Sequence, residues 1–176
     1  MNFMRLVALA AMLGATLAPA SAALDAGVAA PAFKTEASLG GKVFSFDLKD
    51  ALAKGPVVLY FYPAAFTSGC TLEAHDFAEH IGDFKKYNAT VIGVSGDDID
   101  KLNKFSVSEC RSKFAVASDK DLKIAKSYDA VLANMYANRT SYVIAQDGKI
   151  VYMYTSLDPS KHVANTLDAL KKLEAK

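Results

Sequence analysis

The chain has 176 residues, of which 52% are hydrophobic and 22% charged, and its formal net charge is +1. This balance excludes a nucleic-acid binder that depends on a basic patch. The length suits one domain with its own core, and no internal repeat or long Pro-, Gly- or Ser-rich linker divides the chain.

The first 22 residues have the pattern of a secretory signal peptide. Arg5 supplies the positive charge, Leu6 to Leu17 form an apolar core, and residues 20–22 (Ala-Ser-Ala) give a small-residue cleavage pattern. The apolar core is shorter than the roughly 18 residues that a bilayer span requires. We expect cleavage after Ala22 and export to the periplasm or the exterior, with no membrane attachment afterwards. An uncleaved anchor is the alternative.

The mature chain, residues 23–176, is predicted to form a single domain that begins with strands. Residues 43–46 alternate between apolar and polar side chains after a Gly40–Gly41 turn, which predicts a short strand. Residues 57–62 are apolar at every position, which is typical of a central strand buried on both faces.

A cysteine lies where this second strand meets a predicted helix. Apolar residues recur with helical spacing over residues 71–86, so the segment Pro63–Cys70 connects a strand to the start of a helix. There the unpaired backbone N–H groups and the positive end of the helix dipole favour an anion. Because a thiolate is such an anion, Cys70 is a candidate nucleophile. The apolar residues expected on the inner face of the helix are Leu72, Phe77, Ile81 and Phe84.

Strands and helices continue to alternate after this helix. Residues 90–95 predict a second buried strand, and Asp97 and Asp98 are expected to cap a helix that has Cys110 near its end. The remaining predicted elements are a strand at 114–117, a short helix at 122–128, strands at 141–145 and 150–154 joined by an Asp-Gly hairpin, and a terminal helix opened by Asp158–Pro159. This order predicts an α/β fold with a mixed central sheet flanked by helices, close to the thioredoxin arrangement.

Both cysteines, Cys70 and Cys110, belong to the part of the chain that is expected to be exported. In an oxidising compartment they could form one structural disulfide. The position of Cys70 at a helix start favours a reactive pair or a single reactive thiol instead, because thiols at such positions ionise readily.

The residues around Cys70 resemble the active-site signature of the peroxiredoxins. Pro63, Thr67 and Cys70 have the spacing Pro-x-x-x-Thr-x-x-Cys, and residues 139–149 resemble the strand of that family that carries an arginine, followed by an Asp-Gly hairpin. The resemblance covers nearly the whole mature chain. It is closest to the bacterioferritin-comigratory, or Q-type, branch, in which Cys-Thr-x-Glu commonly opens the helix, as it does here at residues 70–73.

The resemblance implies a thiol-dependent peroxidase that reduces hydrogen peroxide and organic hydroperoxides in antioxidant defence and redox homeostasis. Cys70 would be the peroxidatic residue and would pass through a sulfenic acid. Thr67 would position the peroxide, and Pro63 would shield the thiolate from water. Arg139 would stabilise the thiolate and the departing oxygen. Glu73 would orient Arg139; a solvated glutamate on the helix surface is the alternative.

The chain departs from many members of this branch at residue 75, where they carry a second cysteine and this chain has His75. A disulfide within that helix is therefore excluded. Cys110 is the remaining candidate to resolve the sulfenic acid, and some relatives have a resolving cysteine in the corresponding helix. The bond would need Cα atoms within roughly 7 Å or a local unfolding step. The alternative is an inert, buried Cys110 and a one-cysteine mechanism with an external thiol.

The histidines do not indicate a metal site. His75 and Glu79 share a helix face, as do Asp76 and His80, but no Cys-x-x-Cys or His-Glu-x-x-His pattern accompanies them. We therefore expect a solvated face, no metal and no cofactor.

The expected partners are a peroxide and a thiol reductant, either a thioredoxin-like protein or a small thiol, and the expected assembly is a monomer or a weak dimer. Two other functions use a similar fold. An exported thiol–disulfide exchange protein would need a Cys-x-x-Cys motif, and a copper-handling protein would need two neighbouring cysteines. Neither pattern surrounds Cys70.

Overall fold

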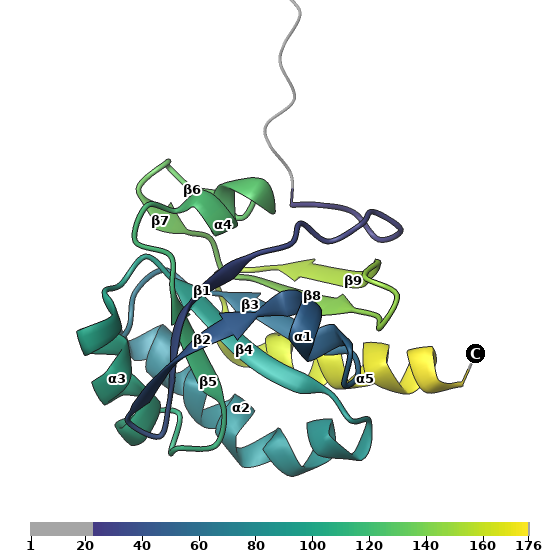
Figure 1. The fold of residues 1–176 in the computed structure, drawn as a ribbon, viewed down its shortest axis with the longest axis horizontal. Helices are drawn as coiled ribbons and strands as arrows, with labels where there is room; N and C mark the ends of the chain where they lie inside the picture. Colours follow the sequence, from purple (N-terminus) through teal and green to yellow (C-terminus); the bar gives the residue numbers. More distant parts are fainter. Residues whose placement is uncertain (1–22, 176) are drawn as a thin grey trace, which may run out of the picture.

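A computed structural model describes residues 23–175, so the predicted signal peptide at residues 1–22 lies outside the described residues. At its centre is a seven-stranded sheet with the strand order β2-β1-β5-β4-β3-β8-β9 (Figure 1). Its strands are β1 (Lys34–Leu39), β2 (Lys42–Asp47), β3 (Val57–Phe61), β4 (Thr90–Ser95), β5 (Ala115–Ser118), β8 (Thr140–Ile144) and β9 (Ile150–Thr155). A separate two-stranded sheet pairs β6 (Val131–Leu132) with β7 (Tyr136–Ala137).

Helices cover both faces of the sheet, which confirms the predicted α/β arrangement. They are α1 (Leu48–Leu52), α2 (Ser68–Lys86), α3 (Ile99–Ser108), α4 (Lys123–Ser127), the 3-10 helix η1 (Pro159–Lys161) and α5 (His162–Glu174). Helices α2, α3 and α5 contribute to one buried apolar cluster, and α1 and α4 contribute to another on the opposite face (Figure 1).

Strand β3 divides the core because successive side chains of a strand point to opposite faces. Val57, Leu59 and Phe61 belong to the cluster under α1 and α4, whereas Val58 and Tyr60 belong to the cluster under α2, α3 and α5. All five residues of the strand are buried, as predicted for a central strand.

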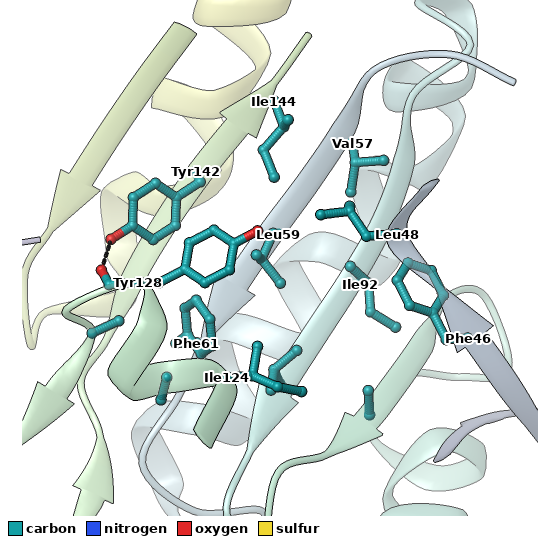
Figure 2. Packing of buried hydrophobic residues seen from close by; sticks show 14 of the residues in the cluster. Phe46, Leu48, Val57, Leu59, Phe61, Ile92, Ile124, Tyr128, Tyr142 and Ile144 are labelled. Atoms are coloured by element: carbon teal, nitrogen blue, oxygen red, sulfur yellow. Dashed lines mark hydrogen bonds between the residues drawn. The ribbon is translucent and has the colours of Figure 1, made fainter. Parts of the chain in front are cut away.

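A polar contact in the cluster under α1 and α4 ties the sheet to the residue that follows α4. Figure 2 shows the Tyr142 hydroxyl on β8 donating a hydrogen bond to the Tyr128 carbonyl just beyond α4, at 2.7 Å. A buried tyrosine hydroxyl needs such a partner, so this bond fixes the position of α4 over the sheet.

The pairing of strands brings two distant parts of the sequence together. Strand β3 runs parallel to β4 and antiparallel to β8, with Phe61 opposite Thr140. The residue before Thr140 therefore lies beside the point where the chain leaves β3.

The structure corrects several details of the sequence prediction. Strand β1, helix α1 and the β6–β7 pair were not predicted, and Cys110 lies beyond the end of α3 at Ser108. Leu72 is 62% exposed rather than internal, because the buried stripe of α2 passes through Glu73 instead. Asp98 alone caps α3, since its side chain accepts a hydrogen bond from the backbone N–H of Lys101.

None of the helices within residues 23–175 combines the length and the apolar character needed to cross a membrane.

Two glycines provide a matched test of the packing on the α2 face. A Cβ at Gly93 in β4 would lie 2.6 Å from the Tyr60 ring, whereas a Cβ at Gly82 in α2 would meet no atom within 4 Å. We expect Gly93→Ala to lower the free energy of unfolding by about 1–3 kcal/mol, which is typical of overpacking. Gly82→Ala should raise it by up to about 1 kcal/mol, because alanine favours a helix. Urea denaturation measures both, and equal effects would contradict this packing.

Candidate active site

Cys70 lies in the first turn of α2, as predicted. Thr67 is the N-cap of the helix, Cys70 is its third residue, and the cysteine side chain is buried. Pro63 lies half-buried in the connection between β3 and α2. The thiol is therefore held at a helix N-terminus and largely out of contact with water.

Thr67 does not use its hydroxyl to cap the helix. The hydroxyl donates to the Ala64 carbonyl at 2.9 Å, and no hydrogen bond joins it to the first turn of α2. A hydroxyl has one proton and two lone pairs, so its oxygen can still accept a hydrogen bond from a molecule near Cys70.

Asp97 anchors the connection between β3 and α2. Its Oδ2 accepts from the Ala65 backbone N–H at 2.7 Å and from the Ser95 hydroxyl at 2.8 Å, and its Oδ1 accepts from Lys101 at 2.6 Å. Sequence reasoning assigned Asp97 to a helix cap, because the residue also precedes α3. The connection is thus tied to the end of the neighbouring strand β4.

Phe66, in the same connection, has a φ of 68° and is half exposed. Positive φ is uncommon outside glycine. Its ring packs edge-on against Phe105 of α3, with ring centroids 5.2 Å apart. This contact stabilises the backbone turn that leads into α2.

Arg139 contacts Cys70 from the end of the loop before β8. Its Nη2 donates to the Cys70 Sγ at 3.3 Å, its Nη1 donates to Glu73 Oε2, and its Nε donates to the Leu157 carbonyl at 3.0 Å. Burial opposes the charge, but Glu73 and Cys70 outweigh it and raise the pKa of the guanidinium. A charged and rigidly held donor therefore faces the sulfur.

Gly69 allows the Arg139 guanidinium to come this close to Cys70. A Cβ at Gly69 would lie 3.2 Å from Arg139 Nη2, which is tighter than an ordinary contact. The absence of a side chain at this position lets the guanidinium reach the first turn of α2.

Glu73 is completely buried, so the alternative of a solvated glutamate is wrong. Burial raises the pKa of its carboxyl to about 8, and Arg139 only partly opposes this effect. Its second oxygen, Oε1, has no hydrogen-bond partner among the described residues.

Sequence reasoning missed a buried histidine beside this carboxyl. His162, the first residue of α5, is fully buried, and its Nδ1 lies 2.8 Å from the Ser141 hydroxyl and 3.7 Å from Glu73 Oε1. Its Nε2 lies 3.0 Å from the Ser156 carbonyl. Burial lowers the pKa of the imidazole to about 4. The polar Ser141 in the buried strand β8 was the available signal.

Cys110 is free, like Cys70, and both belong to the apolar cluster under α2, α3 and α5. Cys110 is completely buried, and burial raises the pKa of its thiol well above the ordinary value. The segment around it is fixed to α2 by two pairs: His75 Nε2 lies 2.9 Å from Glu109 Oε2, and Arg111 Nη1 lies 3.0 Å from Glu79 Oε1.

One of the two histidines of α2 has a partner other than the expected one. His75 pairs with Glu109 rather than Glu79, whereas His80 pairs with Asp76 as its spacing suggested. Within residues 23–175, no group of three or more His, Cys, Asp or Glu side chains is arranged to hold a metal ion.

Comparisons with known proteins agree on one family. The sequence profile of the AhpC/TSA family matches residues 26–153. A protein of Helicobacter pylori strain J99 named "Putative peroxiredoxin bcp" is 35% identical over an alignment of 154 residues that covers 84% of this chain and 98% of that protein. The "Peroxiredoxin Q, chloroplastic" of Oryza sativa subsp. japonica is 38% identical over 121 residues, 67% of this chain and 55% of that protein.

Solved structures agree with this match. Peroxidoxin BcpB from Mycobacterium tuberculosis superposes with a TM-score of 0.75 at 29% identity, covering 84% of this chain and 96% of that one. Thioredoxin peroxidase I of Plasmodium yoelii superposes with a TM-score of 0.78 at 26% identity, covering 86% and 91%. These likenesses confirm the predicted thioredoxin-like fold.

Gly69 gives a test that separates reactivity from stability. We expect Gly69→Ala to displace Arg139 from Cys70 and to slow alkylation of Cys70 by iodoacetamide at about pH 6 by roughly threefold or more, because a hydrogen bond to a charged group is weakened. Global stability should be unchanged or slightly higher, because alanine favours the helix. Gly82→Ala in the same helix is the control and should leave alkylation unchanged. An equal rate in both variants would contradict the role of Gly69.

Proposed function

The chain belongs to the AhpC/TSA family of peroxiredoxins and is a thiol-dependent peroxidase, and from this premise we propose which residues carry the reaction. Cys70 is the peroxidatic residue. The observation that supports this assignment is the Arg139 guanidinium, which donates to the Cys70 sulfur at 3.3 Å in the first turn of α2. The alternative of an exported thiol–disulfide or copper-handling protein is not favoured, because the relatives found are peroxiredoxins.

The reaction is a two-electron oxidation of the sulfur. The Cys70 thiolate attacks one peroxide oxygen, an S–O bond forms, and the O–O bond breaks. Cys70 becomes a sulfenic acid, and the second oxygen leaves as hydroxide or alkoxide and takes up a proton from solvent. Arg139 stabilises both the thiolate and the charge on the departing oxygen, because a guanidinium remains charged at any working pH.

The neighbouring residues position the peroxide. The Thr67 hydroxyl donates a hydrogen bond to the Ala64 carbonyl, so the hydroxyl oxygen is available to accept a hydrogen bond from the peroxide O–H. Pro63, half-buried in the connection between β3 and α2, is assigned the role of shielding the thiolate from water. Glu73 holds the guanidinium through its Oε2 and so fixes the direction of the donor that reaches Cys70.

Peroxiredoxins use peroxides and thiol reductants, and we assign this chain a thioredoxin-like protein or a small thiol as its reductant. The sulfenic acid condenses with a thiol to give a disulfide and water, and a second thiol then reduces the disulfide. A monomer or weak dimer is consistent with the exposed large apolar side chains of residues 23–175, which come from several separate elements.

We also propose that residues 1–22 direct export and are removed, so that the enzyme works in the periplasm or outside the cell. The support is the sequence pattern: one positive charge, a short apolar core and an Ala-Ser-Ala cleavage site. In such a compartment, disulfides persist.

One mass-spectrometry experiment tests these assignments together. Protein purified from whole cells and treated with one equivalent of hydrogen peroxide should begin at Ala23 and carry the first oxidation on Cys70. Cys70→Ser should abolish peroxide consumption while leaving the circular dichroism spectrum unchanged, because a serine hydroxyl does not ionise near neutral pH. Substantial peroxidase activity in the Cys70→Ser variant would remove the central assignment. A mature chain that retains residues 1–22 would remove the export proposal alone.

We further propose that Cys110 resolves the sulfenic acid, with an S–S bond formed and water released. In the reduced structure this thiol is buried and poorly ionised, so the segment at 109–112 must first leave its place. The backbone helps, because Arg111 and Ser112 have φ values of 50° and 55°, which non-glycine residues rarely adopt. The His75–Glu109 and Arg111–Glu79 pairs hold the segment in place until then.

Cys110→Ser should still react with one equivalent of peroxide, but it should turn over slowly with a thioredoxin-like reductant and be over-oxidised to sulfinic acid more readily. Glu109→Gln should speed disulfide formation in the parent enzyme, because it weakens the pair with His75. The control is Asp83→Asn, which breaks an exposed ion pair with Lys86 in α2, the helix that carries His75. Quenched-flow mass analysis under non-reducing conditions measures both effects.

Unlinked thiols after peroxide treatment, together with full turnover by a small thiol, would make the protein a one-cysteine enzyme. Cys110 would then be a buried core residue. Equal disulfide rates in Glu109→Gln and Asp83→Asn would show that the His75–Glu109 pair does not control the segment.

A further inference from the structure

The two oxygens of the Glu73 carboxyl have different surroundings. Oε2 accepts a hydrogen bond from Arg139, whereas Oε1 is buried and has no hydrogen-bond partner among the described residues. Oε1 lies 3.7 Å from the Nδ1 of His162. A buried carboxylate oxygen without a hydrogen-bond partner costs free energy. The positions of the protons on Glu73 and His162 therefore need an explanation.

The hydrogen bonds of His162 assign its tautomer. Nε2 lies 3.0 Å from the Ser156 carbonyl, which can only accept, so Nε2 carries a proton. In a neutral imidazole, Nδ1 is then an acceptor, and the Ser141 hydroxyl at 2.8 Å donates to it. The face of His162 that is turned toward Glu73 therefore presents a lone pair and not a donor.

An ionised Glu73 would thus aim an unpaired anionic oxygen at a lone pair. A proton on Oε1 removes this conflict, because Oε1 then presents a donor toward Nδ1 instead of a second lone pair. Nδ1 has a single lone pair, so a hydrogen bond from Oε1 requires that the Ser141 hydroxyl rotate away from Nδ1 and that a small movement close the 3.7 Å distance. Transfer of that proton to Nδ1 leaves the pair with the same net charge. Whether the proton lies on Oε1 or on Nδ1, the Glu73–His162 pair carries no net charge.

We propose that Glu73 and His162 hold one proton between them, and that His162 is a positioning residue which acts through Glu73 on Arg139. This inference rests on the proposed role of Arg139 at Cys70. While the proton is present, the positive charge of Arg139 is compensated only by the Cys70 thiolate. When it is lost, Glu73 becomes a second anion that competes for the same guanidinium.

The environment of the pair supports this assignment. Burial raises the pKa of Glu73 to about 8 and lowers the pKa of His162 to about 4, so burial favours the neutral form of each group. Besides each other, the titratable or charged groups that face the pair are Arg139 before β8, Asp76 on α2, Tyr60 on β3, Tyr154 on β9 and Asp158 before η1. Arg139 is the one cation among these groups.

The proposal predicts a fall in peroxidase activity on the alkaline side. Above the pH at which the pair loses its proton, Arg139 is shared with an ionised Glu73 and stabilises the thiolate and the departing oxygen less. The second-order rate constant with hydrogen peroxide should then decrease as the pH rises.

Stopped-flow measurement of that rate constant from about pH 5.5 to 9.5 tests the proposal with four variants. Glu73→Gln cannot lose a proton and should abolish the alkaline decrease. His162→Gln keeps a donor for the Ser156 carbonyl but lacks the acceptor at Nδ1, so the decrease should move to lower pH. At about pH 8 its rate constant should be roughly fivefold below that of the parent, the effect of one lost hydrogen bond.

His162→Asn places an amide oxygen near the position of Nδ1 and should restore most of the profile, which a purely structural role for the ring would not explain. His80→Gln, a partly exposed histidine on α2, is the control and should leave the profile unchanged. An infrared band from a protonated carboxyl that titrates in the alkaline range, present in the parent and absent in Glu73→Gln, provides a readout independent of activity. The same band should persist in Cys70→Ser.

The outcomes separate the two proposals. Absence of peroxide consumption in the parent enzyme would overturn the proposed function, whatever the infrared result. Peroxide consumption with an identical alkaline decrease in Glu73→Gln, or with neither a protonated-carboxyl band that Glu73→Gln removes nor a protonated His162 imidazole, would overturn the shared proton. An imidazolium–carboxylate pair, seen as a carboxylate band with a protonated imidazole, would support a shared proton that rests on His162.

Discussion

The site depends on the cost of burying the charge of Arg139. A buried cation is tolerated only when acceptors surround it, and here its acceptors come from α2, from the loop after β9 and from the sulfur itself. Glu73 is buried because the guanidinium requires it, and Gly69 lacks a side chain where the guanidinium passes. The loop that accepts from Arg139 through the Leu157 carbonyl also accepts from His162 through the Ser156 carbonyl, so Arg139 and His162 share one support.

The sheet makes this arrangement possible by bringing distant segments together. Because β3 lies between β4 and β8, the connection that carries Cys70 is reached from one side by Asp97 and from the other by Arg139. The first contact fixes the backbone at Ala65 and the second fixes the charge near the sulfur. Cys70, the proposed reactive residue, is on a helix end, but its geometry is set by residues at the ends of the two strands that flank β3.

The sequence predicts what periodicity and local spacing can encode, and misses what depends on tertiary contact. Strand β3, helix α2 and the placement of Cys70 at a helix start follow from apolar patterns and from the motif around the cysteine. Strand β1 alternates weakly, and the exposure of Leu72 depends on how α2 turns to bury a charged residue. From the sequence alone, Asp97 could either cap α3 or anchor the connection between β3 and α2. Only the fold decides between these two roles. His162 lies far from Glu73 in sequence, so no local pattern could join them.

The proposed roles give the two cysteines opposite mechanical requirements, and the strengths of the surrounding interactions match these roles. Removing a buried hydrogen-bond partner of a charged group, as in the Arg139–Glu73 contact, typically costs about 1–3 kcal/mol or more, so the Cys70 side of the site stays rigid. An exposed pair such as Arg111–Glu79 contributes only about 0–1 kcal/mol, and it holds a segment whose backbone is already unfavourable. The segment of Cys110 can therefore leave its place while Arg139 remains fixed. A resolving reaction at Cys110 then requires local unfolding on one side of the site only.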